Sequence, residues 1–106
     1  LKGDKCYDLG QKYLKKGSCG VLSFGVKGGR KAAEEVMKHL KTIAIETHVA
    51  DARSCCLHPA SATHRQMNDE ELAKAGVSPE LIRLSVGIEN VDDLIEDLDG
   101  ALAVLD

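Results

Sequence analysis

Apolar and polar positions alternate in two segments of the chain, 19–26 and 81–86, and this period of two predicts β-strands. Two shorter β-like stretches lie between them, at 43–47 and 54–57. Each long strand has one apolar face, made of Leu22, Phe24 and Val26 in the first and of Ile82, Leu84 and Val86 in the second. The opposite face is mixed and carries Val21, Ser23, Gly25, Leu81, Arg83 and Ser85. We expect a second domain or a ligand to cover this mixed face, the alternative being a half-exposed antiparallel sheet.

Four other segments, 4–16, 30–41, 68–75 and 91–102, show the helical period, in which apolar residues recur every three or four positions. The third begins with a capping-box pattern and ends at a glycine, formed by Asn68, Glu71 and Gly76. The last helix, which Asn90 can cap, has an apolar stripe that we expect to face the core: Val91, Leu94, Ile95, Leu98 and Leu102.

The resulting order is helix, strand, helix, strand, strand, helix, strand, helix. It predicts a small α+β layer with a mostly antiparallel sheet and helices on one face. A chain of 106 residues fits one compact domain with a moderate core. The helical segment 1–17 begins without a cap or a preceding turn. We therefore expect 1–17 to run in from a larger domain and 18–106 to form the small domain proper.

Composition narrows the function classes. Apolar residues make up 43% and charged residues 29% of the chain, which is typical of a globular protein. A net charge of −3 and only three aromatic residues argue against nucleic acid as a partner. No apolar run approaches the roughly 20 residues that span a membrane. The four cysteines lack the spacing of a small secreted framework, so we expect reduced thiols and a cytoplasmic location.

Arg83 is the first candidate for chemistry. It stands in mid-strand between apolar neighbours, where an unpaired guanidinium would be costly. The planar fork of an arginine binds a carboxylate at two points. Arg83 can therefore bind the carboxylate of a substrate or form a structural bridge to an acid such as Glu89, and its chemistry alone leaves both interpretations open.

Two other groups of residues merit a hypothesis. A zinc site in the polar turn after the third strand would use Cys55, Cys56, His58 and His64. It is disfavoured because adjacent cysteines point to opposite strand faces and no Cys-x-x-Cys or His-x-x-x-His pair is present. The histidines are more typical of hydrogen-bonding struts. The glycine-rich segment 25–30 precedes a helix but lacks phosphate-loop spacing, which favours a tight strand-to-helix turn.

Several motifs resemble a known family. They are His-Pro-Ala-Ser-Ala-Thr-His-Arg-Gln-Met at 58–67, Asp-Glu-Glu-Leu-Ala-Lys-Ala-Gly at 69–76, Leu-Ile-Arg-Leu-Ser-Val-Gly-Ile-Glu at 81–89 and Asp-Asp-Leu-Ile-Glu-Asp-Leu at 92–98. Together they resemble the C-terminal domain of the Cys/Met-metabolism enzymes that depend on pyridoxal phosphate (PLP), which have fold type I. The segments 13–17, 21–30 and 47–53 are most similar to O-acetylhomoserine sulfhydrylases.

The resemblance implies roles for three residues. Arg83 matches the family arginine that binds the α-carboxylate of the substrate, which favours the first of its two interpretations. Thr63 matches a residue that supports this arginine. His48 stands where relatives commonly carry Ser or Asn, whose backbone lies beside the carboxylate. The resemblance therefore implies a role for the backbone of His48 but none for its side chain.

The resemblance also implies a larger enzyme. The lysine that binds PLP, the phosphate ligands and the stacking aromatic belong to the family's N-terminal domain, so we expect this segment alone to be inactive. The whole enzyme would be a transferase of methionine biosynthesis, tetrameric, that replaces the acetate of O-acetylhomoserine by sulfide or a thiol, giving homocysteine or methionine. The alternatives are a cystathionine γ-synthase, a methionine γ-lyase, and a free-standing amino-acid-binding domain without catalysis.

Overall fold

A four-stranded sheet in the order β1-β4-β3-β2 forms the centre of the computed structural model, which describes all 106 residues. The strands are β1 Val21–Gly25, β2 Ala44–Ile45, β3 Cys55–Leu57 and β4 Leu81–Ser85. β4 pairs antiparallel with both β1 and β3, whereas β2 pairs parallel with β3. The sheet is therefore mixed, and the expected antiparallel pairing holds for two of its three strand contacts.

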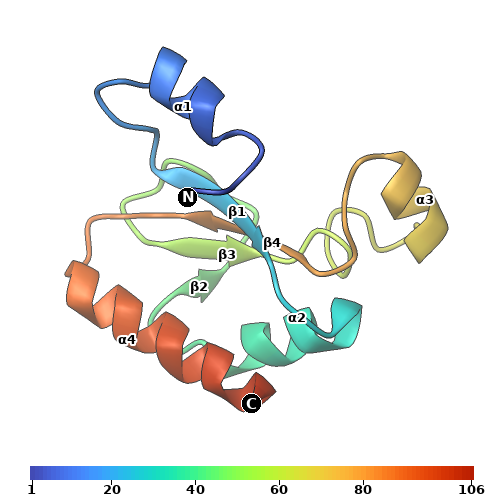
Figure 1. The fold of residues 1–106 in the computed structure, drawn as a ribbon. Helices are drawn as coiled ribbons and strands as arrows, with labels where there is room; N and C mark the ends of the chain where they lie inside the picture. The colour runs from blue at the N-terminus through green and yellow to red at the C-terminus, as the bar shows by residue number, and fades with distance from the viewer.

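Only two of the four helices cover the sheet. The helices are α1 Tyr7–Tyr13, α2 Gly29–His39, α3 Asp69–Lys74 and α4 Val91–Leu102, followed by the short 3-10 helix η1 Ala103–Leu105. Figure 1 shows α2 and α4 together on one side of the sheet, α1 on the other side and α3 projecting at one end. The expectation that all helices share one face is thus wrong for α1 and α3. None of the helices has the length and apolarity that a membrane crossing requires.

The core lies between the sheet and the pair α2 and α4. Its buried members include Val36 and Met37 of α2, Ile82 and Leu84 of β4, and Leu94 of α4. Alternation placed Ile82 and Leu84 correctly, because successive side chains of a strand point to opposite faces. It was wrong for Leu22 and Val86 at the strand ends, which are 47% and 38% exposed. A core of this kind derives its stability from apolar surface removed from water, at roughly 25 cal/mol per Å².

The predicted apolar stripe of α4 is only partly correct. Leu94 is buried and Leu98 packs partly buried against the core, but Val91, Ile95 and Leu102 are 63%, 58% and 37% exposed. The buried face contains Asp97 instead, whose carboxylate accepts hydrogen bonds from three consecutive backbone N–H groups, those of residues 41–43, at 2.8–2.9 Å. This anchor fixes α4 with Asp97 turned inward, and the rotation leaves Val91 and Ile95 outside.

The capping box of α3 is confirmed. The Asn68 side chain accepts from the Glu71 N–H, and the Glu71 carboxylate accepts from the Asn68 N–H, both at 2.9 Å. The segment 58–80 that contains α3 leaves the sheet after β3 and returns at β4. The buried ring of His58 joins the two ends of this segment, because it hydrogen-bonds to the Ser61 hydroxyl and to the Pro79 carbonyl. This agrees with a histidine that acts as a strut.

Candidate functional site

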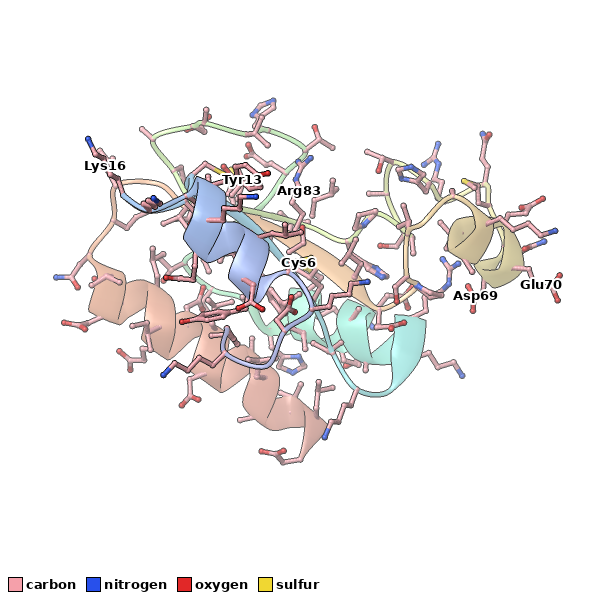
Figure 2. All side chains as sticks on the ribbon, turned by 45° about the horizontal axis from the view of Figure 1, so that its top comes forward. Cys6, Tyr13, Lys16, Asp69, Glu70 and Arg83 are labelled. Carbon is pink, nitrogen blue, oxygen red and sulfur yellow. The ribbon has the colours of Figure 1, made fainter.

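Arg83 lies in the middle of the sheet, on the face away from α2 and α4. It is paired in register with Ser23 of β1 and with Leu57 of β3. Figure 2 shows its side chain above the sheet, distant from the acidic residues Asp69 and Glu70 of α3. Its Nη2 donates to the Thr47 carbonyl at 2.7 Å, and its Nε and Nη1 have no hydrogen-bond partner in the chain. The guanidinium is therefore anchored by one nitrogen and otherwise unpaired.

A loop of the chain itself, residues 46–53, covers part of the mixed sheet face. Ser85 of β4 and Cys55 of β3 are paired on this face, and each is only 2% exposed. The loop contacts both, because the Ala50 N–H donates to Ser85 Oγ at 3.2 Å and the Cys55 thiol donates to the Arg53 carbonyl at 3.3 Å. Over these two residues the loop 46–53 itself covers the mixed face, where we had expected a second domain or a ligand.

The proposed bridge between Arg83 and Glu89 is absent from the structure. Glu89 accepts instead from Ser54, whose backbone N–H and hydroxyl bind its two carboxylate oxygens at 2.6 and 2.8 Å. The N–H of Ser54, with help from its hydroxyl, lowers the pKa of the Glu89 carboxyl. The Ser54 hydroxyl also accepts from the Gly87 N–H at 2.8 Å. These contacts tie the end of the loop to the segment after β4 and leave the Arg83 fork free of acids.

His48 follows the Thr47 carbonyl that holds Arg83, so the structure brings this position next to the arginine. Its side chain is exposed and turned toward its own loop. Nδ1 lies 3.1 Å from Glu46 Oε2 and 3.9 Å from Asp51 Oδ2. The imidazole thus faces acids of its own loop, and a role for the His48 backbone beside a substrate carboxylate stays a prediction.

Thr63 is exposed in the turn after β3, and its hydroxyl hydrogen-bonds to His64 Nδ1 at 2.9 Å. No hydrogen bond joins Thr63 to Arg83 in this structure, since the one contact of Arg83 is to Thr47. The turn itself is held by Arg30, which donates to the Ala60 carbonyl at 2.7 Å and to the Asp69 carboxylate at 2.6 Å. A supporting role of Thr63 for Arg83 stays a prediction.

The glycine-rich segment before α2 is a tight turn. Gly28 and Gly29 have φ angles of 110° and 69°, which favour glycine, and a Cβ on Gly28 would lie 2.8 Å from the Ala32 side chain. The Arg30 that follows is engaged with α3 and the polar turn, as described above. Both features support the interpretation of this segment as a strand-to-helix connection.

The residues considered for zinc do not converge. Cys56 belongs to the core between sheet and helices, whereas Cys55 lies under the loop 46–53 on the other face. His58 is occupied by Ser61 and Pro79. No group of three or more His, Cys, Asp or Glu side chains is arranged to hold a metal ion, and all four cysteines are free.

Sequence reasoning did not assign a role to Ser85, Ser54 or Asp97. Ser85 had a usable signal, because it shares the mixed face with Arg83 at a spacing of two. The sequence around Ser54 and Asp97 contains no such signal. Their hydrogen-bond partners lie 35 and about 55 positions away in the chain, and only the fold brings them together.

Known proteins resemble this chain over nearly its whole length. A family model described as Cys/Met metabolism PLP-dependent enzyme matches residues 1–103. An O-acetyl-L-homoserine sulfhydrylase of Thermus thermophilus is 50% identical over 97 residues, which are 92% of this chain and 23% of that protein. A homocysteine synthase of Schizosaccharomyces pombe is 44% identical over 104 residues, covering 98% of this chain and 24% of that protein.

Solved structures agree. A structure from Campylobacter jejuni assigned as an O-acetylhomoserine (thiol)-lyase, which carries N′-pyridoxyl-lysine-5′-monophosphate, matches with a TM-score of 0.83 and 38% identity over 97% of this chain and 24% of that one. A cystathionine gamma lyase of Micromonospora echinospora matches with a TM-score of 0.70 and 38% identity, over 78% of this chain and 21% of that one. The chain spans about a quarter of the length of these relatives. It belongs to the Cys/Met-metabolism family of PLP-dependent enzymes.

Proposed function

We propose that this chain is the C-terminal, substrate-carboxylate-binding domain of an O-acetylhomoserine sulfhydrylase. The observation that carries the proposal is the state of Arg83, whose guanidinium is fixed by the Thr47 carbonyl and has no acidic partner. Support for the subfamily comes from the relatives named O-acetyl-L-homoserine sulfhydrylase and homocysteine synthase.

An arginine anchored by one nitrogen is suited to a carboxylate. The Thr47 carbonyl takes one of the two N–H groups of Nη2. The other, together with an N–H of the adjacent nitrogen on the free edge, can form two parallel hydrogen bonds to a carboxylate, which add geometric specificity to the charge attraction. The bond to Thr47 restricts the guanidinium in advance, so less rotamer freedom is lost when a substrate binds. We expect removal of the guanidinium to cost about 2–5 kcal/mol of substrate binding if the bound pair is desolvated.

The polar hollow between α2 and α4 does not have the lining of a PLP site. A phosphate group would need clustered N–H donors or basic side chains around a hollow, with a lysine and an aromatic ring nearby. This hollow, of about 500 Å³ between the end of α2 and the middle of α4, is lined by His39 and Lys41 but also by three acids, Asp93, Glu96 and Asp97, and by no Phe, Tyr or Trp. PLP, the cofactor of the family, is therefore assigned to the remainder of the enzyme, where it would supply the electron sink of the reaction.

This domain would orient the amino-acid substrate for that chemistry. Holding the α-carboxylate fixes one end of O-acetylhomoserine, so that its Cα–H bond and the acetate on Cγ take a defined position. Acetate is then replaced by sulfide or a thiol. In this proposal the backbone at His48 lies beside the same carboxylate and Thr63 supports Arg83. We further propose that the segment 1–17 runs in from the larger domain, and that the enzyme is a cytoplasmic tetramer.

Product analysis tests the subfamily. The full-length protein with PLP, supplied with O-acetylhomoserine and sulfide, is expected to release homocysteine and acetate in equal amounts. Cystathionine formation with cysteine as nucleophile, or methanethiol release from methionine, would replace this proposal by cystathionine γ-synthase or methionine γ-lyase activity. Binding of the amino acid without turnover would favour a non-catalytic role.

A further inference from the structure

The loop that covers the mixed sheet face contains an unusual backbone conformation. Ala50 is the one non-glycine residue of the chain with a positive φ angle, 57°. This left-handed region is unfavourable for a residue with a Cβ, and such conformations persist where surrounding contacts hold them. Ala50 is exposed, so packing of its own side chain does not account for its conformation.

The contact that holds Ala50 comes from Ser85. The buried hydroxyl of Ser85 accepts the Ala50 N–H at 3.2 Å, and Ser85 lies two positions after Arg83 on β4, so both side chains point to the same face. Arg83 binds the same loop three residues earlier, at the Thr47 carbonyl. Two neighbouring side chains of one rigid strand therefore hold the loop, one through a carbonyl and the other through an N–H.

We propose that Ser85 is a positioning residue for Arg83. Its hydroxyl holds Ala50 in the left-handed conformation, and this turn directs the loop so that the Thr47 carbonyl meets one edge of the guanidinium and leaves the rest of the fork for a carboxylate. Glu89 and Ser54 fix the far end of the loop, so Ser85 determines its middle. The inference rests on the proposed function, because it gives Ser85 its role through the carboxylate site.

The test uses the full-length enzyme with PLP and the variants Ser85→Ala and Ser85→Thr. Loss of one hydrogen bond should raise the KM for O-acetylhomoserine about fivefold in Ser85→Ala. Because the reacting groups are untouched, kcat should stay within about twofold, and PLP affinity should not change. Ser85→Thr keeps the hydroxyl and should restore the KM. Ser23→Ala is the matched control, since Ser23 lies on the same face beside Arg83, is exposed and has no side-chain hydrogen bond.

Hydrogen exchange gives a readout independent of turnover. Peptides that cover 46–53 should take up deuterium faster in Ser85→Ala than in wild type or Ser23→Ala, while core peptides of α2 and β4 stay protected. A second pair of variants avoids any change in the buried strand. Ala50→Gly permits the left-handed turn and should keep the KM, whereas Ala50→Val opposes it and should raise the KM.

The outcomes separate the two proposals. Suppose that Arg83→Ala raises the KM but Ser85→Ala and Ala50→Val leave both KM and exchange unchanged. The role of Ser85 is then overturned and the carboxylate role of Arg83 survives. If Arg83→Ala also leaves the KM unchanged, the proposed function fails and this inference fails with it. A uniform loss of kcat, PLP affinity and core protection in both Ser85 variants, with Ala50→Val unaffected, would make Ser85 purely structural.

Discussion

Asp97 is the residue whose placement departs most from the hydrophobic pattern of the chain. An acid in the buried stripe of a helix is costly unless it is paired, and here three backbone N–H groups pair it. Burial acts to raise the pKa of Asp97, but the N–H groups of residues 41–43 outweigh it, and the pKa lies below its usual value. The carboxylate thus joins the segment that follows α2 to α4 in its ionised form.

Asp97→Asn should destabilise the fold by about 2 kcal/mol, since an amide binds these donors less strongly than a charged group does. The folded-state pKa is depressed, so the contribution is present above the unfolded pKa of roughly 4 and is lost as pH falls through the folded value. Urea unfolding should therefore separate wild type from Asp97→Asn at pH 7 and less so at pH 3. The control variant Asp99→Asn changes an exposed neighbour and should be as stable as wild type at both pH values. An equal loss of stability in Asp97→Asn and Asp99→Asn would contradict the role of Asp97.

The four cysteines should differ in reactivity for a physical reason. Burial, followed by the nearby Asp97 and Cys55, raises the pKa of the Cys56 thiol to about 12, and burial also raises the pKa of Cys55. Because the thiolate is the reactive form, alkylation of the native protein at pH 8 should label Cys6 and Cys19 and spare the other two. Peptide mapping checks this, with unfolded protein as the control in which all four react. Rapid native labelling of Cys56 would contradict its position in the core.

At the scale of elements, the sequence predicted what local rules control. Alternation located β1 and β4, and the capping box located α3, because both signals arise between residues close in the chain. Local rules could not predict the course of the loop 46–53. Its course depends on Arg83, Ser85 and Glu89, more than thirty positions away. Arg83 itself could be singled out from its place in the strand and from the family resemblance, but its anchoring on Thr47 could not.

The junction between the loop and the segment after β4 leaves no room for a side chain at Gly87. A Cβ there would lie 2.3 Å from the Ala52 carbonyl oxygen and 2.6 Å from the Ser54 nitrogen. Gly87→Ala should therefore force the two backbone segments apart, at a cost of about 1–3 kcal/mol.

Gly100→Ala provides the contrast within the same fold. Gly100 lies in α4, where a Cβ would meet nothing within 4 Å, so alanine should stabilise the helix by roughly 0.5–1 kcal/mol. Thermal unfolding of the two variants should shift in opposite directions. Equal stability of Gly87→Ala and wild type would mean that the contact between the segments is looser than described.

At the scale of the whole molecule, our proposal is that this domain gives the enzyme one end of its substrate site. The chain spans about a quarter of the length of its relatives, and its sheet holds Arg83 in contact with the Thr47 carbonyl of the loop 46–53. In this proposal the remaining chemistry belongs to PLP, the cofactor of the family, held by the remainder of the enzyme. This division predicts that changes at Arg83 affect recognition of the substrate and leave the cofactor in place.

Discrimination between a carboxylate and its amide is the decisive property of the site proposed around Arg83. The full-length enzyme with PLP would be assayed for kcat/KM with O-acetylhomoserine and with its α-carboxamide, in wild type, Arg83→Ala and the control Ser23→Ala. Wild type and the control should prefer the carboxylate by a factor on the order of 100, and Arg83→Ala should lose most of this preference while its PLP affinity stays unchanged. If Arg83→Ala still prefers the carboxylate as strongly as wild type, another residue binds it, and the central role given to Arg83 is wrong.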